Sequence, residues 1–302
     1  MLLSLQSAVE LGIIYAIMAL GVFISFRTLN IPDLTVDGSF TLGASVSAVL
    51  CMNGQPVLGI LLAFIVGCLA GSLTAILNTK LKIQPLLAGI LMMLALWSIN
   101  LKVMGKANIS LLNKNTIYDL FNFSDASDYL KIIISAVILI AILILLYLFL
   151  KTKLGIVLRA TGDNDQMVRA LGVNTNWTVI IGLALSNGLV AVSGALIAQY
   201  QGFSDVSMGI GMVVIGLASV IIGEVIFGIK TLMRRLVAVI LGAIVYRLVI
   251  ALALELGMPT NDLKLISAVI VALALSMSTI KGRFVKLKRR MSLTNTSEGG
   301  RD

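Results

Sequence analysis

The sequence predicts an all-α protein, a polytopic transmembrane helical bundle of about eight or nine spans, and two observations support this fold class. First, 59% of the 302 residues are hydrophobic and only 12% are charged, and the mean hydropathy is +1.04. A soluble domain averages about one quarter charged residues. Second, the apolar residues form continuous runs rather than alternating with polar ones, which indicates membrane helices and argues against a membrane β-barrel.

Nine apolar runs are expected to form the spans, because a membrane helix needs roughly 20 apolar residues. They cover approximately residues 5–26, 40–52, 56–77, 85–104, 130–150, 177–199, 208–229, 236–256 and 263–280. The polar segment 105–128 is expected to be an external loop, and the Ile- and Leu-rich run 130–150 is expected to face lipid. Residues 1–280 therefore form one transmembrane domain, and residues 281–302 form a basic tail.

A polar stretch interrupts the chain after the first run, and Pro32, Asp33, Asp37 and Gly38 are expected to break the helix there. The run that follows, 40–52, is too short to cross a membrane unaided. We interpret it as a re-entrant or discontinuous helix near the N-terminus. The alternative is a cytoplasmic loop followed by a span that begins at Asp37.

Lysine and arginine residues mark one side of the predicted bundle. They cluster at residue 27 and within 80–82, 151–169, 230–235 and 281–290. By the positive-inside rule this side is cytoplasmic, and the C-terminus lies on it. Nine crossings then place the N-terminus outside. Because the net charge of +9 comes from these clusters, it does not indicate a nucleic-acid partner.

The segment between the fifth and sixth runs is far too polar to cross a membrane, and it predicts a short cytoplasmic helix near 163–171. Asp163 is expected to be its N-cap with Gln166 in a capping-box arrangement, and Gly172 its left-handed C-cap. One face is expected to carry three apolar side chains, Met167, Val168 and Leu171. The other side carries Asn164, Asp165 and Arg169. Such a helix either lies on lipid headgroups or binds a partner protein outside the bilayer.

Arg247 stands near the middle of the eighth run, where an unpaired charge costs at least ~2.5 kcal/mol. It must therefore face the interior of the bundle. Glu224, in the preceding run, is the predicted partner, either in a structural ion pair or as part of a gate in the passage. Ser186 and Asn187 are interpreted as hydrogen-bonding groups between helices, with contact to cargo as the alternative.

The sequence offers no catalytic or metal-binding constellation. Histidine is absent, which removes the commonest general base and metal ligand. Cys51 and Cys68 are expected to be packing residues. The chain also has no Walker motif for binding ATP. We therefore expect a protein that is not an enzyme and holds no metal and no cofactor of its own.

Three segments together resemble the ABC-importer permeases of the branched-chain amino-acid and ribose type. The specific one is TKLGIVLRATGDNDQMVRALGVNTN, which is similar to the family's central signature. YAIMALGVFISFRTLNIPDLTVDGSFTLGAS resembles the N-terminal motif, and GLASVIIGEVIFG resembles the Gly-rich segment near the C-terminus. The resemblance implies a permease subunit of the bacterial cytoplasmic membrane that pairs with a second copy. It also implies a cytoplasmic ATPase dimer that binds ATP and Mg, and an extracytoplasmic substrate-binding protein.

The resemblance also implies roles for individual residues. The short cytoplasmic helix would dock in a groove of the ATPase and couple ATP hydrolysis to transport. The coupling residues are then Arg159, Gly162, Asp163, Asn164, Met167, Val168, Arg169, Leu171 and Gly172.

The N-terminal motif departs from the family's usual Asn-Phe-Ala-His-like string, because this chain has IPDLTVDG at residues 31–38. It resembles a subgroup of permeases linked to aromatic amino acids such as tryptophan or tyrosine. The predicted substrate path comprises Asp33, Asp37, Ser39, Asn187 and Arg247. The predicted function is import of a small polar solute, an aromatic or branched-chain amino acid by preference. The alternatives are a nucleoside, sugar or vitamin-like solute, or a stand-alone channel or secondary transporter.

Overall fold

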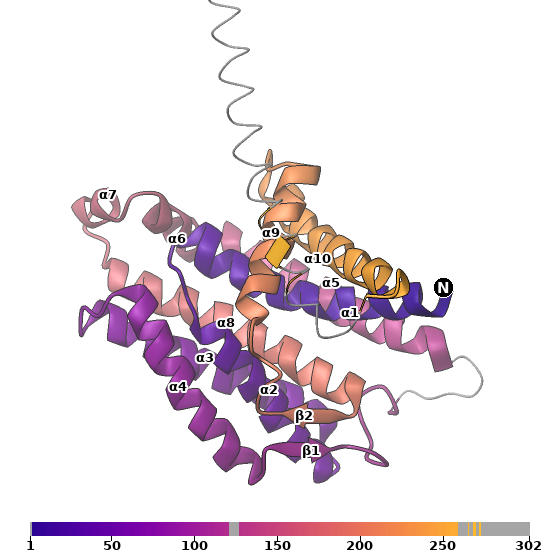
Figure 1. Cartoon of the computed structure of the whole chain (residues 1–302). Helices are drawn as coiled ribbons and strands as arrows, with labels where there is room; N and C mark the ends of the chain where they lie inside the picture. The colour runs from indigo at the N-terminus through magenta and orange to yellow at the C-terminus, as the bar shows by residue number, and fades with distance from the viewer. Residues whose placement is uncertain (1, 121–126, 259–264, 266–267, 270–271, 273–302) are drawn as a thin grey trace, which may run out of the picture.

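In a computed structural model, which describes residues 2–120 and 127–258 and four isolated positions between 265 and 272, the chain is a bundle of helices with one small two-stranded sheet (Figure 1). The first half contains α1 (Leu2–Val22), its π-helical extension η1 (Phe23–Thr28), α2 (Thr35–Met52), α3 (Pro56–Thr79), α4 (Pro85–Met104) and strand β1 (Asn108–Ser110). The second half contains α5 (Ser127–Lys151), α6 (Lys153–Asp163), α7 (Asp165–Ala170), α8 (Thr175–Gln201), strand β2 (Phe203–Asp205), α9 (Met212–Phe227) and α10 (Leu232–Glu255).

Seven of the described helices are long and apolar enough to cross a membrane. They are α1 with η1, α2, α3, α4, α5, α8 and α10, and the shorter α9 has 16 residues. The predicted polytopic helical bundle is thus confirmed. The predicted ninth span at 263–280 and the basic tail at 281–302 lie outside the described residues apart from isolated positions.

The core of the bundle lies around α8, which packs against α1, α2 and α3. Close approach depends on small residues, as in other membrane bundles. A Cβ added to Gly43 of α2 would lie 1.9 Å from the carbonyl oxygen of Ala191, and one added to Gly194 would lie 2.0 Å from that of Phe40. The backbones of α2 and α8 are therefore in direct contact, and any larger side chain at these glycines would push them apart.

The outer helices present apolar side chains to their surroundings. Only 17% of the α5 span is buried within the protein, compared with 78% of the α8 span. Since α5 is also the most hydrophobic span, this exposure agrees with the expectation that residues 130–150 face lipid.

Basic segments that are distant in the sequence meet at one end of the bundle. Arg27, Arg159, Lys230 and Arg235 line a common cavity, and the Lys82 and Arg169 segments line a neighbouring one. Strands β1 and β2, which follow the C-terminal ends of α4 and α8, pair as a two-stranded antiparallel sheet at the opposite end (Figure 1). This arrangement agrees with the positive-inside orientation, in which the basic end is cytoplasmic.

The polar break after α1 is shorter than expected, because α2 begins at Thr35. The prediction that Asp37 and Gly38 interrupt the helix is wrong. Asp37 is tolerated because a carboxylate in the first turn interacts favourably with the helix dipole. A Cβ on Gly38 would lie 2.8 Å from the side chain of Leu96, so glycine allows α4 to pack closely there.

The remaining break, residues 29–34, reaches into the bundle. Asp33 contacts Asn187, which lies about 18 Å along α8 from its first residue at a rise of about 1.5 Å per residue. At its C-terminal end α2 packs near the sheet of β1 and β2, where Ala48 and Cys51 belong to the same hydrophobic cluster as Ile109. The break thus lies within the bundle, as the interpretation as a discontinuous helix expects, but α2 is also long and apolar enough to cross a membrane, as the alternative of a loop followed by a span expects. A re-entrant helix does not fit the structure, because α2 runs on to the end of the bundle that carries β1 and β2.

Candidate functional site

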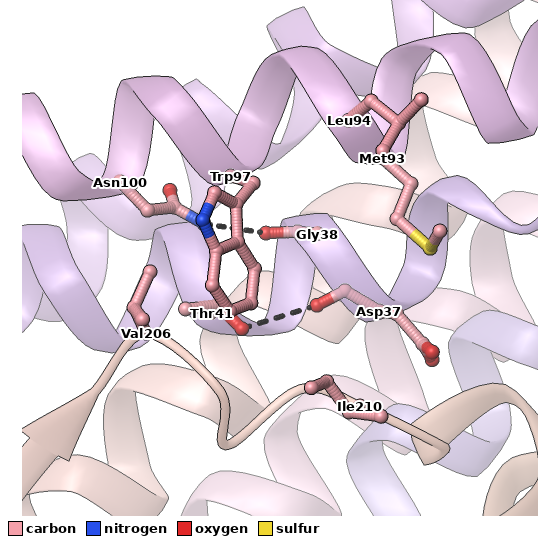
Figure 2. Close-up of a pocket in the computed structure, with 9 residues that line it drawn as sticks. All are labelled: Asp37, Gly38, Thr41, Met93, Leu94, Trp97, Asn100, Val206 and Ile210. Carbon is pink, nitrogen blue, oxygen red and sulfur yellow. Dashed lines mark hydrogen bonds between the residues drawn. The ribbon is translucent and has the colours of Figure 1, made fainter. Parts of the chain in front are cut away.

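A cavity of about 290 Å³ lies where α2, α4 and the connection between β2 and α9 meet (Figure 2). It is lined by Asp37, Gly38, Thr41, Met93, Leu94, Trp97, Asn100, Val206 and Ile210. Most of this lining is apolar, with a few polar groups, which is the usual composition of a small-molecule site.

The wall formed by α4 combines an exposed aromatic ring with a buried amide. Met93, Trp97 and Asn100 follow one another at helical spacing, so they lie on one face. The Trp97 side chain is 41% exposed, whereas Asn100 is only 1% exposed. Asn100 Nδ2 donates to the carbonyl oxygen of Gly38 at 3.3 Å. Asn100 Oδ1 is buried and has no hydrogen-bond partner among the described residues.

Asp37, a predicted path residue, forms part of the opposite wall. Its carboxylate accepts hydrogen bonds from the backbone N–H of Gly211 at 2.9 Å and of Val213 at 2.8 Å. These groups lie at the N-terminus of α9, where free backbone donors favour a negative charge. Asp37 therefore holds the start of α9 against α2, and its carboxylate is already satisfied by protein groups.

The sheet of β1 and β2 holds the start of the segment between β2 and α9, which contributes Val206 and Ile210 to the cavity. Asp205 Oδ1 accepts from the backbone N–H of Ser207 at 2.8 Å, and Asn108 Nδ2 donates to Asp205 Oδ2 at 3.2 Å. Hydrogen bonds from Ser207 lower the pKa of the Asp205 carboxyl below its usual range. The carboxylate thus stays charged and keeps the turn after β2 in place.

Three other predicted path residues meet in a closed network away from this cavity. Asn187 Nδ2 donates to Asp33 Oδ2 at 2.6 Å, and Ser39 Oγ donates to Asn187 Oδ1 at 2.7 Å. The remaining oxygen of Asp33 accepts from Thr35 N at 2.9 Å. All of these side chains are fully buried. The network joins the break, α2 and α8, and none of the three path residues lines the cavity of Figure 2.

Glu224 pairs with arginines at the basic end, and the predicted Glu224–Arg247 pair is wrong. The carboxylate forms ion pairs with Arg27 of η1 and with Arg235 Nε at 2.8 Å. The depth of the two groups explains the difference. Glu224 lies one turn before the end of α9, whereas Arg247 lies deep in α10, and Arg235 in the first turns of α10 reaches the carboxylate instead.

Arg247 has an aromatic partner. Its guanidinium carbon lies 4.0 Å from the ring centroid of Tyr15 in α1, and that ring stacks on Phe40 at 6.1 Å. A desolvated cation over an aromatic face is stabilised by the ring quadrupole. Arg247 Nε is buried without a hydrogen-bond partner in the described part of the chain. Arg247 does face the interior, as predicted, but it does not line the cavity of Figure 2.

The segment predicted to be cytoplasmic forms two helices, α6 and α7, that protrude at the basic end (Figure 1). The predicted N-cap is wrong: Asp163 ends α6, and the side chain of Asn164 accepts from Met167 N at 3.0 Å. Asn164 is the N-cap of α7 because it has the extended backbone conformation that an N-cap requires. Gly172 has the predicted left-handed conformation, with φ of +83°.

The apolar side chains of α7 divide between two directions. Met167 and Leu171 are 49% and 75% exposed, whereas Val168 is 3% exposed and packs toward the bundle. Arg169 bonds Asp165 within α7 and donates to Thr175 Oγ1 at 2.8 Å, which ties α7 to the first residue of α8. Of the other residues predicted to couple to an ATPase, Gly162 packs so closely on η1 that a Cβ there would lie 1.9 Å from the carbonyl oxygen of Thr28. Arg159 lines the basic cavity beside Arg27.

Comparison with known proteins decides the family. The model of the family described as "Branched-chain amino acid transport system / permease component" matches residues 4–276. The chain belongs to this permease family. It is thus a multi-pass membrane permease of ABC-type transport, as the sequence predicted.

Relatives of this permease include transporters with named substrates. It is 46% identical to a tyrosine transport system permease protein of Clostridioides difficile over 266 residues, 88% of each chain. It is 35% identical to an uncharacterized protein of Rickettsia prowazekii, over 90% of this chain and 96% of the other. It is 27% identical to a probable branched-chain amino acid transport permease, LivH, of Methanocaldococcus jannaschii, over 65% of this chain and 66% of the other.

A solved structure supports the fold of the permease. PsaBC from Streptococcus pneumoniae, solved in complex with a Fab, matches 94% of each chain with a TM-score of 0.50 at 17% identity. At this identity the likeness concerns the arrangement of helices alone.

Sequence reasoning missed several polar residues of this permease. Trp97 and Asn100 line the cavity, and an asparagine inside an apolar span is the signal that would have found Asn100. Glu10 was missed as well: it is buried in α1 and accepts a hydrogen bond from the Tyr200 hydroxyl at 2.5 Å. Within the described residues, no group of three or more His, Cys, Asp or Glu side chains is placed to hold a metal.

Proposed function

We propose that this permease is the translocating subunit of an ATP-driven importer for an amino acid, aromatic by preference. The observation that carries the proposal is the 46% identity to a tyrosine transport permease over 88% of both chains, within a family match that spans residues 4–276. The assembly would contain two copies of the permease, a cytoplasmic ATPase dimer and an external substrate-binding protein.

The contact with the ATPase is proposed at α6 and α7. Four large apolar side chains are exposed there, Leu154, Ile156, Met167 and Leu171. Exposed charged residues, including Lys151, Lys153 and Asp163, lie close to them in the sequence. An apolar centre with a charged rim is typical of a protein interface rather than of a lipid-facing surface.

The same helices have contacts that would transmit a push into the bundle. Gly162 brings α6 against Thr28 at the end of η1, and Arg169 connects α7 to Thr175 at the start of α8. Because α8 forms the centre of the core, a displacement of α7 would move both α8 and the end of α1. Closure of the ATPase on ATP and Mg would in this way switch the two bundles between outward and inward openings. The energy comes from the partner, since this chain has no Walker motif.

The proposal is tested with Leu171→Asp in the complete transporter. A charge on this exposed tip is expected to abolish amino-acid uptake and co-purification with the ATPase, while membrane insertion and the helical content stay normal. Leu112→Asp is the matched control, because Leu112 is 79% exposed and follows β1, at the end of the bundle away from α7. It is expected to retain the ATPase.

Three results would each contradict a part of the proposal. Normal uptake by the Leu171→Asp variant would remove the coupling role of α7. Recovery of the native permease without any ATPase, with ion-driven flux, would make it a secondary transporter. Competition of uptake by nucleosides or sugars rather than by amino acids would change the solute class.

A further inference from the structure

Four basic side chains from separate parts of the chain meet around one cavity at the basic end of the bundle (Figure 1). Arg27 lies in η1 and Arg159 in α6. Lys230 lies in the connection between α9 and α10, and Arg235 in the first turns of α10. The cavity has a volume of about 230 Å³, and its remaining lining comprises Phe23, Thr28, Asp163, Ile229, Thr231 and Leu232.

The positive charge around this cavity exceeds the negative charge. The Glu224 carboxylate pairs with the arginines of η1 and α10, and Asp163, the second carboxylate, is exposed in the lining. Within the described part of the chain, neither Arg159 nor Lys230 forms an ion pair with a carboxylate. Four cations thus face two anions, and two positive charges remain unbalanced. A cleft lined by charge of one sign attracts ions of the opposite sign.

Most of the polar groups in this lining are hydrogen-bond donors. Guanidinium and ammonium groups carry donors and no acceptor. Thr231 Oγ1 accepts from the backbone N–H of Arg234 at 3.3 Å, which leaves its own proton to donate. Thr231 is also the N-cap of α10, and a helix N-terminus favours a negative group. A phosphate group, with its charged acceptor oxygens, matches these donors.

The surroundings of the cavity favour a phosphate that belongs to a lipid. The cavity lies where the span of α1 with η1 ends and the span of α10 begins, which is the level of lipid headgroups. Ile229 in its lining is 58% exposed, and the nearby Ile226 of α9 is 56% exposed, so apolar side chains lie beside the charges. The volume is below the usual range for small-molecule sites, which suits a headgroup rather than a whole solute.

We propose that this cavity binds the phosphate of an anionic phospholipid of the cytoplasmic leaflet, such as phosphatidylglycerol. Basic pockets between transmembrane helices on the cytoplasmic side are a recurrent form of anionic-lipid site. Arg159 and Lys230 supply the unbalanced charge, and the bound phosphate connects η1, α6 and the start of α10. The inference requires no particular solute and no ATPase, so its failure is distinguishable from that of the proposed function.

The test measures binding of two lipids to the purified permease in detergent by native mass spectrometry. Phosphatidylglycerol is compared with phosphatidylcholine of the same acyl chains, whose headgroup has no net charge. The native permease is expected to bind phosphatidylglycerol about tenfold more tightly, the equivalent of one hydrogen bond between charged groups. Equal affinity for the two lipids would overturn the proposal.

Single substitutions locate the site. Arg159→Gln is expected to remove most of the preference for phosphatidylglycerol. Lys230→Gln, at an exposed position, is expected to lower it threefold to fivefold, on the order of one exposed charge pair, and Lys230→Arg is expected to keep it. Asp163→Asn removes a negative charge from the lining and is expected to raise the preference by up to about fivefold. Because damage to the fold does not increase binding, this variant separates binding from stability.

Lys80→Gln is the matched control. Lys80 is an exposed lysine that follows α3 at the same basic end, but it does not line this cavity. Its replacement is expected to leave the preference unchanged. If Lys80→Gln lowers the preference as much as Lys230→Gln does, the lipid is attracted by surface charge in general and the site is wrong.

Two competition experiments identify the ligand. Displacement of phosphatidylglycerol by inorganic phosphate at comparable concentration would show that the cavity takes a free phosphate, and would overturn the lipid assignment. Loss of the lipid preference when an ATPase binds the permease would assign the cavity to that protein interface instead. If Arg159→Gln does not reach the membrane, Lys230→Gln decides, because Lys230 is exposed and has no ion pair to lose among the described residues.

Discussion

Replacement of Glu224 by glutamine is expected to destabilise the basic end of the bundle. The Glu224 side chain is 6% exposed and pairs with Arg27 and Arg235, whose side chains are 45% and 31% exposed. Removal of one partner from a fully buried pair costs about 3–5 kcal/mol, whereas an exposed pair contributes about 0–1 kcal/mol. Because water can reach both arginines here, we expect the free energy of unfolding to fall by about 1–2 kcal/mol, between these limits.

The measurement is unfolding of the purified permease in detergent or bicelles. Asp165→Asn serves as the control, since it removes the Asp165–Arg169 pair, whose side chains are 45% and 59% exposed. Its expected effect is below about 0.5 kcal/mol, as for other pairs four residues apart on a helix. Equal losses in the two variants would refute the distinction between them.

A double-mutant cycle identifies the partner of Glu224. The cycle between Glu224→Gln and Arg235→Gln is expected to show coupling of about 1 kcal/mol, because the two groups are in contact. The cycle between Glu224→Gln and Arg247→Gln is expected to be additive. Coupling to Arg247 and none to Arg235 would refute the ion-pair assignment.

Two further predictions concern the packing and capping of helices. Gly43→Ala is expected to lower the free energy of unfolding by about 1–3 kcal/mol, because its Cβ would meet the α8 backbone. Gly59→Ala is expected to cost less, since the atom nearest to an added Cβ lies 3.2 Å away. Similar thermal unfolding of both variants would contradict the close contact of α2 with α8. Asn164→Ala is expected to destabilise α7 by about 1 kcal/mol, and Asp163→Ala to have little effect, as read from hydrogen exchange at residues 165–170. Faster exchange only in the Asp163 variant would restore the capping box expected from the sequence.

Properties that depend on neighbouring residues were predicted well from the sequence. The spans follow from the length of apolar runs, and the common end of the basic segments follows from the charges between them. The left-handed Gly172 was also predicted, since a glycine after an amphipathic turn favours that conformation. The end of the break before α2 was placed too late, because the chain is already helical at Asp37 and Gly38, where α4 and α9 pack against α2.

Partners of buried polar groups were predicted poorly. The sequence placed Glu224 and Arg247 in the interior but matched them with each other, whereas the structure gives Glu224 two arginines and Arg247 the ring of Tyr15. Asp33, Ser39 and Asn187 were assigned to a path because they are polar residues in apolar surroundings. The structure brings them together, but their hydrogen bonds are with one another.

By itself the sequence determined that this protein is a polytopic helical bundle, because hydropathy and charge act on each segment regardless of its neighbours, and its motifs resemble those of the permease family. Only the tertiary structure decided which polar groups are satisfied and which remain free. The cavity shows this clearly, since Asn100 of α4, Gly38 of α2 and the connection after β2 are far apart in the chain and meet only when the bundle packs. A free acceptor is a property of that packing, and no local pattern of residues records it.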